Sequence, residues 1–141
     1  MEIATHGPAD REQVIGLWKR CGLVVAHNDP GRDIDFCTSS GHGQVFVGRR
    51  GGSVIASAMV GHDGHRGWIY YLAVAPEEQG KGLGKAMVTH AERYLKELGV
   101  AKIQLMIRET NGEIIAFYER LGYEKQDVIT VSKWLRDPAR H

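Results

Sequence analysis

The chain has 141 residues, and a domain of this length buries roughly 70% of the surface that its unfolded chain exposes, so one hydrophobic core suffices. Lysine and arginine total 18 against 17 aspartate and glutamate residues, and 43% of the residues are hydrophobic. These values exclude a disordered chain and argue against a nucleic-acid partner. No apolar run approaches the ~20 residues of a membrane span, and the N-terminus lacks the pattern of a secretion signal, so we expect a cytoplasmic protein without a membrane partner.

No linker, repeat or block of charge divides the chain, and we expect residues 1–141 to form a single domain. The two cysteines, Cys21 and Cys37, lack C-x-x-C spacing, so we predict that they are reduced, buried and inert. His62 and His65 have no third ligand at a recognisable spacing. We therefore expect no metal site.

The first 40 residues predict one strand and two helices. A helix-start signal at Pro8 and Asp10 precedes apolar residues at helical spacing, and Gly22 ends that helix. A turn then leads into a weaker helix that stops before a loop rich in serine and glycine. The expected strand is Glu2–His6, and the weaker helix spans Gly31–Thr38.

Three β-rich runs follow, separated by short loops that contain glycine, which predicts an antiparallel meander. The runs are Gln44–Arg49, Ser53–Gly61 and Trp68–Ala75. The third run is apolar on both faces, so we expect it in the centre of the sheet.

The second half of the chain alternates helices with strands. Apolar residues at helical spacing predict a long helix over Lys81–Leu98, and strands are predicted at Ile103–Ile107 and Val128–Trp134. Thr110-x-x-Glu113 matches a capping box at the start of a helix that Gly122 ends. The element order predicts a mixed α/β (α+β) fold, with a central, mixed, mostly antiparallel twisted sheet flanked by helices.

Three alternating glycines, Gly80, Gly82 and Gly84, join the third β-rich run to the long helix. Glycine lets the backbone turn with positive φ and approach a ligand closely, and the N–H groups at a helix start favour a phosphate. The spacing does not fit a P-loop, which also needs a hydroxyl at the position of Ala86. A dinucleotide-binding fingerprint needs its third glycine at the position of Lys85.

Gln79, Gly82 and Gly84 instead match the Gln/Arg-x-x-Gly-x-Gly pattern of the acetyl-CoA site in the GNAT (Gcn5-related N-acetyltransferase) superfamily. Leu72-Ala-Val74, followed by a proline, resembles the fourth strand of that family, and Phe117-Tyr-Glu-Arg-Leu-Gly-Tyr123 resembles its last motif. Two loops also resemble the YpeA-like subgroup of small bacterial members. The chain is thereby identified, by resemblance, as a GNAT protein.

This resemblance implies transfer of an acetyl group from acetyl-CoA to a primary amine of an unidentified small-molecule or peptide acceptor, by direct attack in a ternary complex. It implies acetyl-CoA as cosubstrate and no metal, and it leaves a homodimer open. The cofactor contacts that it implies are Leu72, Ala73, Val74, Gln79, Gly80, Lys81, Gly82, Leu83, Gly84, Lys85 and Asn111. For Asn111 the alternative is helix capping, and for the two lysines it is a solvated helix charge.

Tyr118 matches the position of the family's general acid, which protonates the departing CoA thiolate, and a phenol can donate a proton at neutral pH. The alternative is a tyrosine of the hydrophobic core, since Tyr118 lies on the apolar stripe of its helix.

A general base is harder to assign. Many family members carry a glutamate on the fourth strand, whereas Trp68-Ile-Tyr-Tyr-Leu72 has no acid. Asp63 and His65 in the preceding loop are candidates, although an Asp-Gly turn needs no catalytic explanation. Tyr70 and Tyr71 are weaker candidates.

Trp18 and Asp29 are candidates for the border of the acceptor pocket, and packing and capping explain them equally well. The missing glutamate favours an alternative function, a non-catalytic sensor or partner module that binds acyl-CoA.

Overall fold

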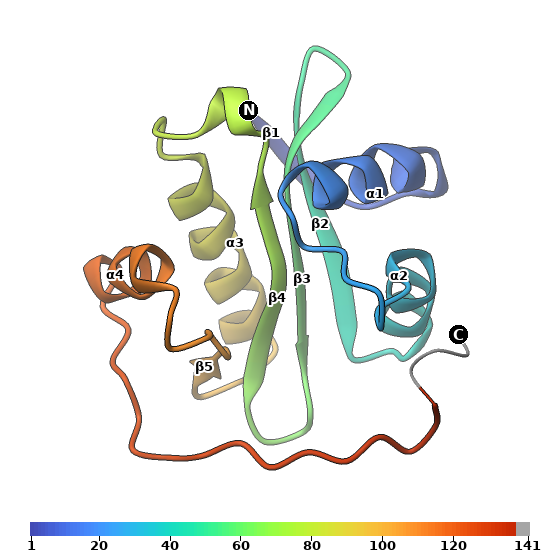
Figure 1. Cartoon of the computed structure of the whole chain (residues 1–141). Helices are drawn as coiled ribbons and strands as arrows, with labels where there is room; N and C mark the ends of the chain where they lie inside the picture. Colours follow the sequence, from blue (N-terminus) through green and yellow to red (C-terminus); the bar gives the residue numbers. More distant parts are fainter. Residues whose placement is uncertain (138–141) are drawn as a thin grey trace.

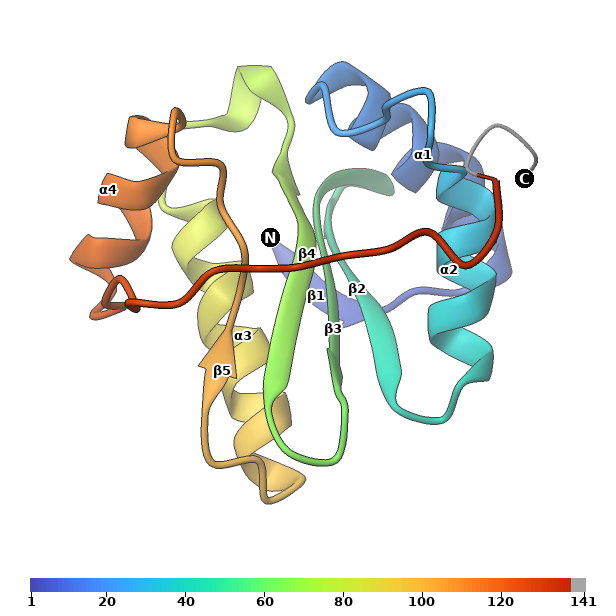
Figure 2. The ribbon, with the colours of Figure 1, turned by 60° about the horizontal axis from the view of Figure 1, so that its bottom comes forward.

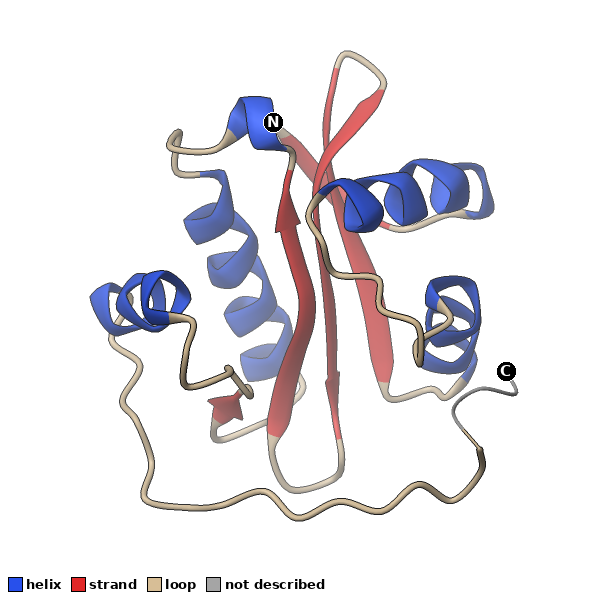
Figure 3. Ribbon diagram, in the orientation of Figure 1, coloured by secondary structure: helices blue, strands red, loops and turns tan. Residues whose placement is uncertain are grey.

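The computed structural model describes residues 1–137, which form five strands and four α-helices, with two short 3-10 turns, η1 and η2 (Figures 1 and 3). Their bounds are β1 Glu2–Thr5, η1 Pro8–Asp10, α1 Arg11–Arg20, α2 Pro30–Ser39, β2 Gly43–Arg50, β3 Ser53–His62, β4 Gly67–Val74, η2 Pro76–Glu78, α3 Leu83–Glu97, β5 Ile103–Gln104 and α4 Gly112–Arg120.

The strands form one sheet in the order β1-β2-β3-β4-β5, in which the first four are antiparallel and β5 runs parallel to β4. The predicted mixed, mostly antiparallel sheet is therefore confirmed. Contact between β4 and β5 is short, because only Gly67 and Trp68 pair with Ile103 and Gln104. Beyond this point the chain after β5 leads away to α4 (Figure 2).

Helices cover both faces of the sheet (Figure 1). On one face, α1 and α2 bury Val14, Trp18 and Ile34 against β2, β3 and β4. On the other face, α3 buries Met87 and Leu95, and α4 adds Tyr118 to the same cluster. Each face thus has its own core, and β4 contributes to both.

Most expected elements are present, several with bounds that differ by one residue, and three larger differences have an identifiable cause. Helix α3 begins at Leu83 instead of Lys81, because Gly82 at its N-cap has a left-handed backbone. Strand β5 ends at Gln104 because the chain then leaves the sheet. The predicted capping box at Thr110 is wrong, since the N-cap is Asn111, whose side chain accepts a hydrogen bond from the backbone N–H of Ile114 at 3.3 Å.

The predicted strand Val128–Trp134 is also wrong. The segment runs from α4 to α2 past the end of the sheet (Figures 1 and 2), and residues 124–136 form no backbone–backbone hydrogen bond with another described residue. Val128, Ile129 and Val131 are 79–89% exposed. Alternating apolar residues favour a strand, but a strand also needs a neighbour with free hydrogen-bonding groups, which the segment lacks here.

The two cysteines are free thiols, as predicted, but half-buried instead of buried. Burial raises the pKa of both thiols, so each stays protonated near neutral pH. None of the described helices has the length and apolarity needed to cross a membrane.

Candidate functional site

The turn between β4 and α3 is the most distinctive local structure of the chain. The short helix η2 follows β4, and the side-chain amide of Gln79 folds back to donate to the carbonyl of Val74 at 3.1 Å. Gly80 and Gly82 then adopt φ values of 79° and 80°, a left-handed conformation that costs other residues roughly 1–2 kcal/mol. The turn therefore requires glycine at these two positions.

The backbone of this turn presents unpaired donors. The six successive N–H groups from Gly80 to Lys85 make no hydrogen bond with any described residue. The first hydrogen bond of α3 is donated by the N–H of Ala86 to the carbonyl of Gly82 at 3.1 Å. Several of these groups belong to the first turn of α3, where the helix dipole places partial positive charge. The geometry suits a bound phosphate.

The third glycine, Gly84, permits close helix packing instead of shaping the turn. Gly84 lies inside α3, and a Cβ atom at this position would sit 3.3 Å from the ring of Phe117 in α4. Gly82 has open space around the corresponding position. Gly84 therefore brings α4 close to α3, whereas Gly80 and Gly82 shape the backbone of the turn.

The two lysines of the turn have different surroundings. The Lys81 ammonium pairs with Glu78 at 3.0 Å, and Glu78 also accepts from Arg50 at 2.7 Å. These pairs lower the pKa of the Glu78 carboxyl, with Lys81 as the largest cause. Lys85 has no ion-pair partner among the described residues and is thus the lysine free to meet a ligand.

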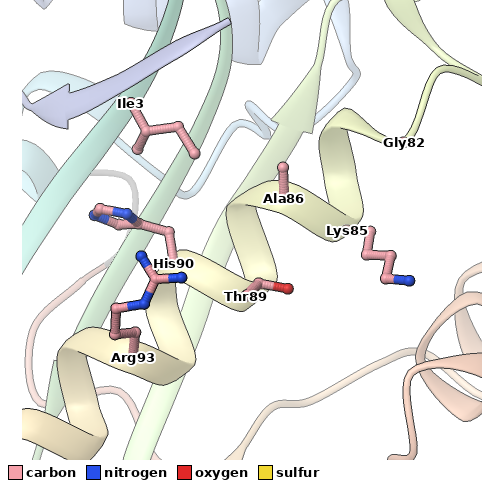
Figure 4. A pocket seen from close by; sticks show the side chains of 7 residues that line it. All are labelled: Ile3, Gly82, Lys85, Ala86, Thr89, His90 and Arg93. Carbon is pink, nitrogen blue, oxygen red and sulfur yellow. The ribbon is translucent and has the colours of Figure 1, made fainter.

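A shallow pocket continues from the turn along α3 (Figure 4). It is lined by Ile3, Gly82, Lys85, Ala86, Thr89, His90 and Arg93. Burial and the nearby Arg93 lower the pKa of His90, so this imidazole is neutral at pH 7 and the positive charge comes from Lys85 and Arg93. The pocket extends the anion-binding character of the turn over about two helical turns.

Strand β4 offers a backbone edge next to this turn. Leu72 and Val74 pack toward the α3 core and Ala73 toward the α1 core, so these side chains have structural partners. The strand has no register partner on the β5 side after Trp68. The edge from Tyr70 to Val74 is therefore the part of β4 on which an extended ligand could form strand-like hydrogen bonds.

Tyr118 of α4 is 4% exposed and packs against the rings of Phe117 and Tyr123. Its hydroxyl makes no hydrogen bond with a described residue. The hydroxyl oxygen is also not fully buried, so it is in part accessible to solvent. Burial raises the pKa of the phenol, which keeps its proton available. The ring therefore belongs to the core, and the role of its hydroxyl as a general acid stays a prediction.

The other sequence candidates have structural duties. Asn111 caps α4, and the Asp29 side chain caps α2 by accepting from the N–H of Arg32 at 3.1 Å. Asp63 accepts from the N–H groups of His65 and Arg66 and from the Trp68 indole, at 2.7–2.9 Å. These bonds, the one from Arg66 first, hold the pKa of Asp63 far below its usual range, which disfavours it as a general base.

Sequence reasoning missed a network on the opposite side of β4. Tyr71 has a φ of 52°, the only positive value at a non-glycine residue in the described chain. Its ring stacks on Trp18 at 3.9 Å, and its hydroxyl donates to Asp33 Oδ2 at 2.6 Å. Ser57 Oγ accepts from the Trp18 indole at 2.7 Å and donates to the Tyr71 carbonyl at 3.1 Å. The sequence signal for this network was the pair of adjacent tyrosines, Tyr70 and Tyr71, because successive side chains of a regular strand point to opposite faces.

No cluster of three or more metal-ligating side chains occurs in the part of the chain that the structure describes.

The chain is similar to known acetyltransferases. A model of the acetyltransferase (GNAT) family matches residues 10–123. A curated relative from Pectobacterium atrosepticum, an acetyltransferase, is 42% identical over 135 residues, which cover 96% of both chains.

Solved structures share the fold. The ribosomal-protein-S18-alanine N-acetyltransferase of Escherichia coli superposes with a TM-score of 0.75 at 25% identity, over 89% of this chain and 78% of that one. The enzyme AAC(6')-Iy, in complex with the bisubstrate analogue CoA-S-monomethyl-acetylneamine, superposes with a TM-score of 0.81 at 19% identity, over 94% and 97% of the two chains.

Proposed function

Because the chain belongs to the acetyltransferase (GNAT) family and is an acyl-CoA-dependent N-acetyltransferase, we propose that it transfers the acetyl group of acetyl-CoA directly to a primary amine while both substrates are bound. The six unpaired N–H groups from Gly80 to Lys85 carry this proposal. A buried or bound phosphate needs several donors at once, and this turn supplies them without a metal ion.

The cofactor contacts follow from the same geometry. The turn binds the pyrophosphate of CoA, and Lys85 and Arg93 in the adjoining pocket pair with its negative charge. The pantetheine arm lies along the open edge of β4 and exchanges hydrogen bonds with the backbone of Leu72–Val74. Gln79 orders the turn from within, since its side chain is bonded to Val74.

The chemical step needs one bond formed and one broken. The neutral amine nitrogen attacks the thioester carbonyl carbon, a backbone N–H of β4 stabilises the oxyanion, and the carbon–sulfur bond then breaks. The departing thiolate takes the proton of the Tyr118 hydroxyl, which has no competing partner in the described chain. The proton that the amine loses passes to solvent, since β4 carries no carboxylate, and the Tyr118 phenolate regains a proton from solvent before the next turnover.

A second candidate function follows from that missing carboxylate. With Asp63 bound in its turn, no free base has been assigned, and a protein that binds acyl-CoA without turning it over would serve as a sensor or partner module. This alternative predicts acetyl-CoA binding, no release of CoA with any amine, and no effect of Tyr118→Phe.

The decisive experiment is calorimetric titration of acetyl-CoA into the wild type and Gly82→Glu, with CoA release measured on the same samples. The matched control is Gly52→Glu, which introduces the same charge at a φ of 83° in the turn between β2 and β3. We expect binding to the wild type and the control and none to Gly82→Glu. Equal binding to all three would contradict a cofactor site at this turn.

Acceptor screening should include small amines, aminoglycosides and alanine-containing peptides, since structural neighbours are named as aminoglycoside acetyltransferases and as a ribosomal-protein-S18-alanine N-acetyltransferase. Association into a homodimer and a cytoplasmic location remain proposals.

A further inference from the structure

The irregularity in β4 changes which side chains face α1 and α2. Ser57 pairs with Ala73 and Met59 with Tyr70, so Ala58 alone faces two residues, Tyr71 and Leu72. A bulge of one residue reverses the alternation of side chains along a strand. Met59 packs in the α1 core, and Tyr70, directly opposite, lies on the same face. The bulge therefore puts both Tyr70 and Tyr71 on the side of α1 and α2.

The result is an aromatic wall that consists of Trp68, Tyr70, Tyr71 and Trp18. Trp68 and Tyr70 are stacked with ring centroids 6.4 Å apart, and Tyr71 and Trp18 are stacked at 3.9 Å. Tyr70 is 44% exposed, so the wall is open to solvent along part of its length. Aromatic faces attract organic cations as well as aliphatic chains.

Asp33 of α2 stands at one end of this wall. It is half-buried, and its Oδ2 accepts from the Tyr71 hydroxyl, while no described Lys, Arg or His pairs with it. The neighbouring acids have other partners. Asp29 accepts from the backbone N–H of Arg32 as the N-cap of α2, and Asp35 pairs with Arg11 at 2.5 Å. Asp33 is therefore the carboxylate of this region that no described cation neutralises, and it is partly accessible to a charged ligand.

The distance of Asp33 from β4 defines which part of a ligand it meets. The carboxylate is separated from the Tyr71 backbone by one tyrosine side chain and one hydrogen bond of 2.6 Å. We therefore place it with a group of the acceptor other than the amine that attacks at the strand edge. A second positive charge on the same acceptor would reach it.

We propose that Asp33, positioned by Tyr71, determines specificity for acceptors that carry a second ammonium group, so that the substrate class is diamines and other polycationic amines. The attacking amine lies at the edge of β4, the carbon chain lies on Tyr70 and Tyr71, and the second ammonium pairs with Asp33. This inference rests on the proposed acetyl transfer and adds a class of acceptor to it.

The charges near Asp33 are compatible with a cationic ligand. Asp33 and Asp29 both raise the pKa of Tyr71, after burial as the first cause, so the phenol remains a neutral donor. Asp33 also raises the pKa of Cys37, again after burial. Arg11 of α1 is occupied by Asp35. The nearby cations Arg32 and Arg136 line a separate pocket with Phe36, and neither forms an ion pair with Asp33.

The test compares kcat/KM for diaminobutane and n-butylamine, corrected for the two equivalent amines, in the wild type and Asp33→Asn. Asparagine keeps an oxygen that accepts from Tyr71 and removes only the charge. We expect the wild type to prefer the diamine by at least about tenfold and Asp33→Asn to lose that preference, because its kcat/KM falls more for the diamine than for the monoamine. The control Asp35→Asn should keep it, and Tyr71→Phe should reduce it in part.

Several outcomes overturn the inference. The first is equal use of both amines by the wild type, and the second is equal loss with both amines in Asp33→Asn, which would mean a structural role. A wild type that binds acetyl-CoA but acetylates neither amine also overturns it and leaves the cofactor site intact. Failure to bind acetyl-CoA, in contrast, contradicts the proposed function itself.

Discussion

The two sides of β4 differ in the groups that they offer to a ligand, backbone N–H groups on one side and side chains on the other. On the α3 side, the proposed cofactor site is a row of backbone N–H groups, and glycine at two positions shapes it. On the α1 and α2 side, the proposed acceptor site is made of side chains from two helices and β4, which one bulge brings together. A site made of backbone is visible in a local sequence motif, whereas a site made of distant side chains becomes visible only in the fold.

The sharpest test of the cofactor side is Tyr118→Phe. The substitution keeps the ring in its core and removes only the unpaired hydroxyl, so we expect kcat to fall about a hundredfold. Calorimetry should find acetyl-CoA affinity within twofold of the wild type. A kcat that is unchanged would remove Tyr118 from the chemistry and leave the thiolate to take its proton from water.

The packing of α4 on α3 provides the next largest effect. Gly84→Val would place methyl groups against the Phe117 ring, and overpacking of this kind destabilises by about 1–3 kcal/mol. Urea unfolding of the single variants and of Gly84→Val/Phe117→Leu should reveal partial rescue in the double variant. Strictly additive losses would mean that Gly84 is not the contact that sets the spacing of these helices.

Ser57→Ala probes the acceptor side without touching its surface. The change leaves the buried Trp18 indole N–H without an acceptor, which costs about 1–3 kcal/mol in unfolding free energy. Because the network and the turn share no hydrogen bond, acetyl-CoA affinity should stay constant while the KM for the amine rises. A parallel loss of cofactor binding would show that the two sides are coupled through β4.

The last prediction is the absence of a decline in kcat in the alkaline range. Burial raises the pKa of the Tyr118 phenol above its ordinary value near 10, so the proton donor persists while a rising pH frees more neutral amine. The kcat should therefore climb from about pH 7 to about pH 10 without a descending limb. A decline that begins near pH 8 would place a more acidic group in the role of donor.

Periodicity and glycine positions predicted nearly all elements and the β4–α3 turn. They could not predict which segments pair with one another in the sheet. Val128–Trp134 has the composition of a strand but no strand partner in the described chain. Ile103–Ile107 was predicted longer than β5 because the chain turns away toward α4 after Gln104. Propensity describes what a segment tolerates, and pairing decides what it becomes.

The candidate site divides in the same way. The residues of the turn were predicted because a phosphate-binding backbone needs glycine wherever it occurs. Asp63 was a reasonable base from its position, but its hydrogen bonds to two N–H groups and an indole were not visible in the sequence. Asp33 was not considered, since its contact with Tyr71 joins residues 38 positions apart.

The short pairing between β4 and β5 has a consequence for handling the protein. The free edge from Tyr70 to Val74 is a template onto which an extended chain can add, including the apolar Val128–Leu135 of a second molecule. An acetyl-CoA arm along that edge would block such addition. Preparations stripped of CoA should therefore aggregate sooner on concentration and storage than preparations supplied with it. Light scattering measures this difference.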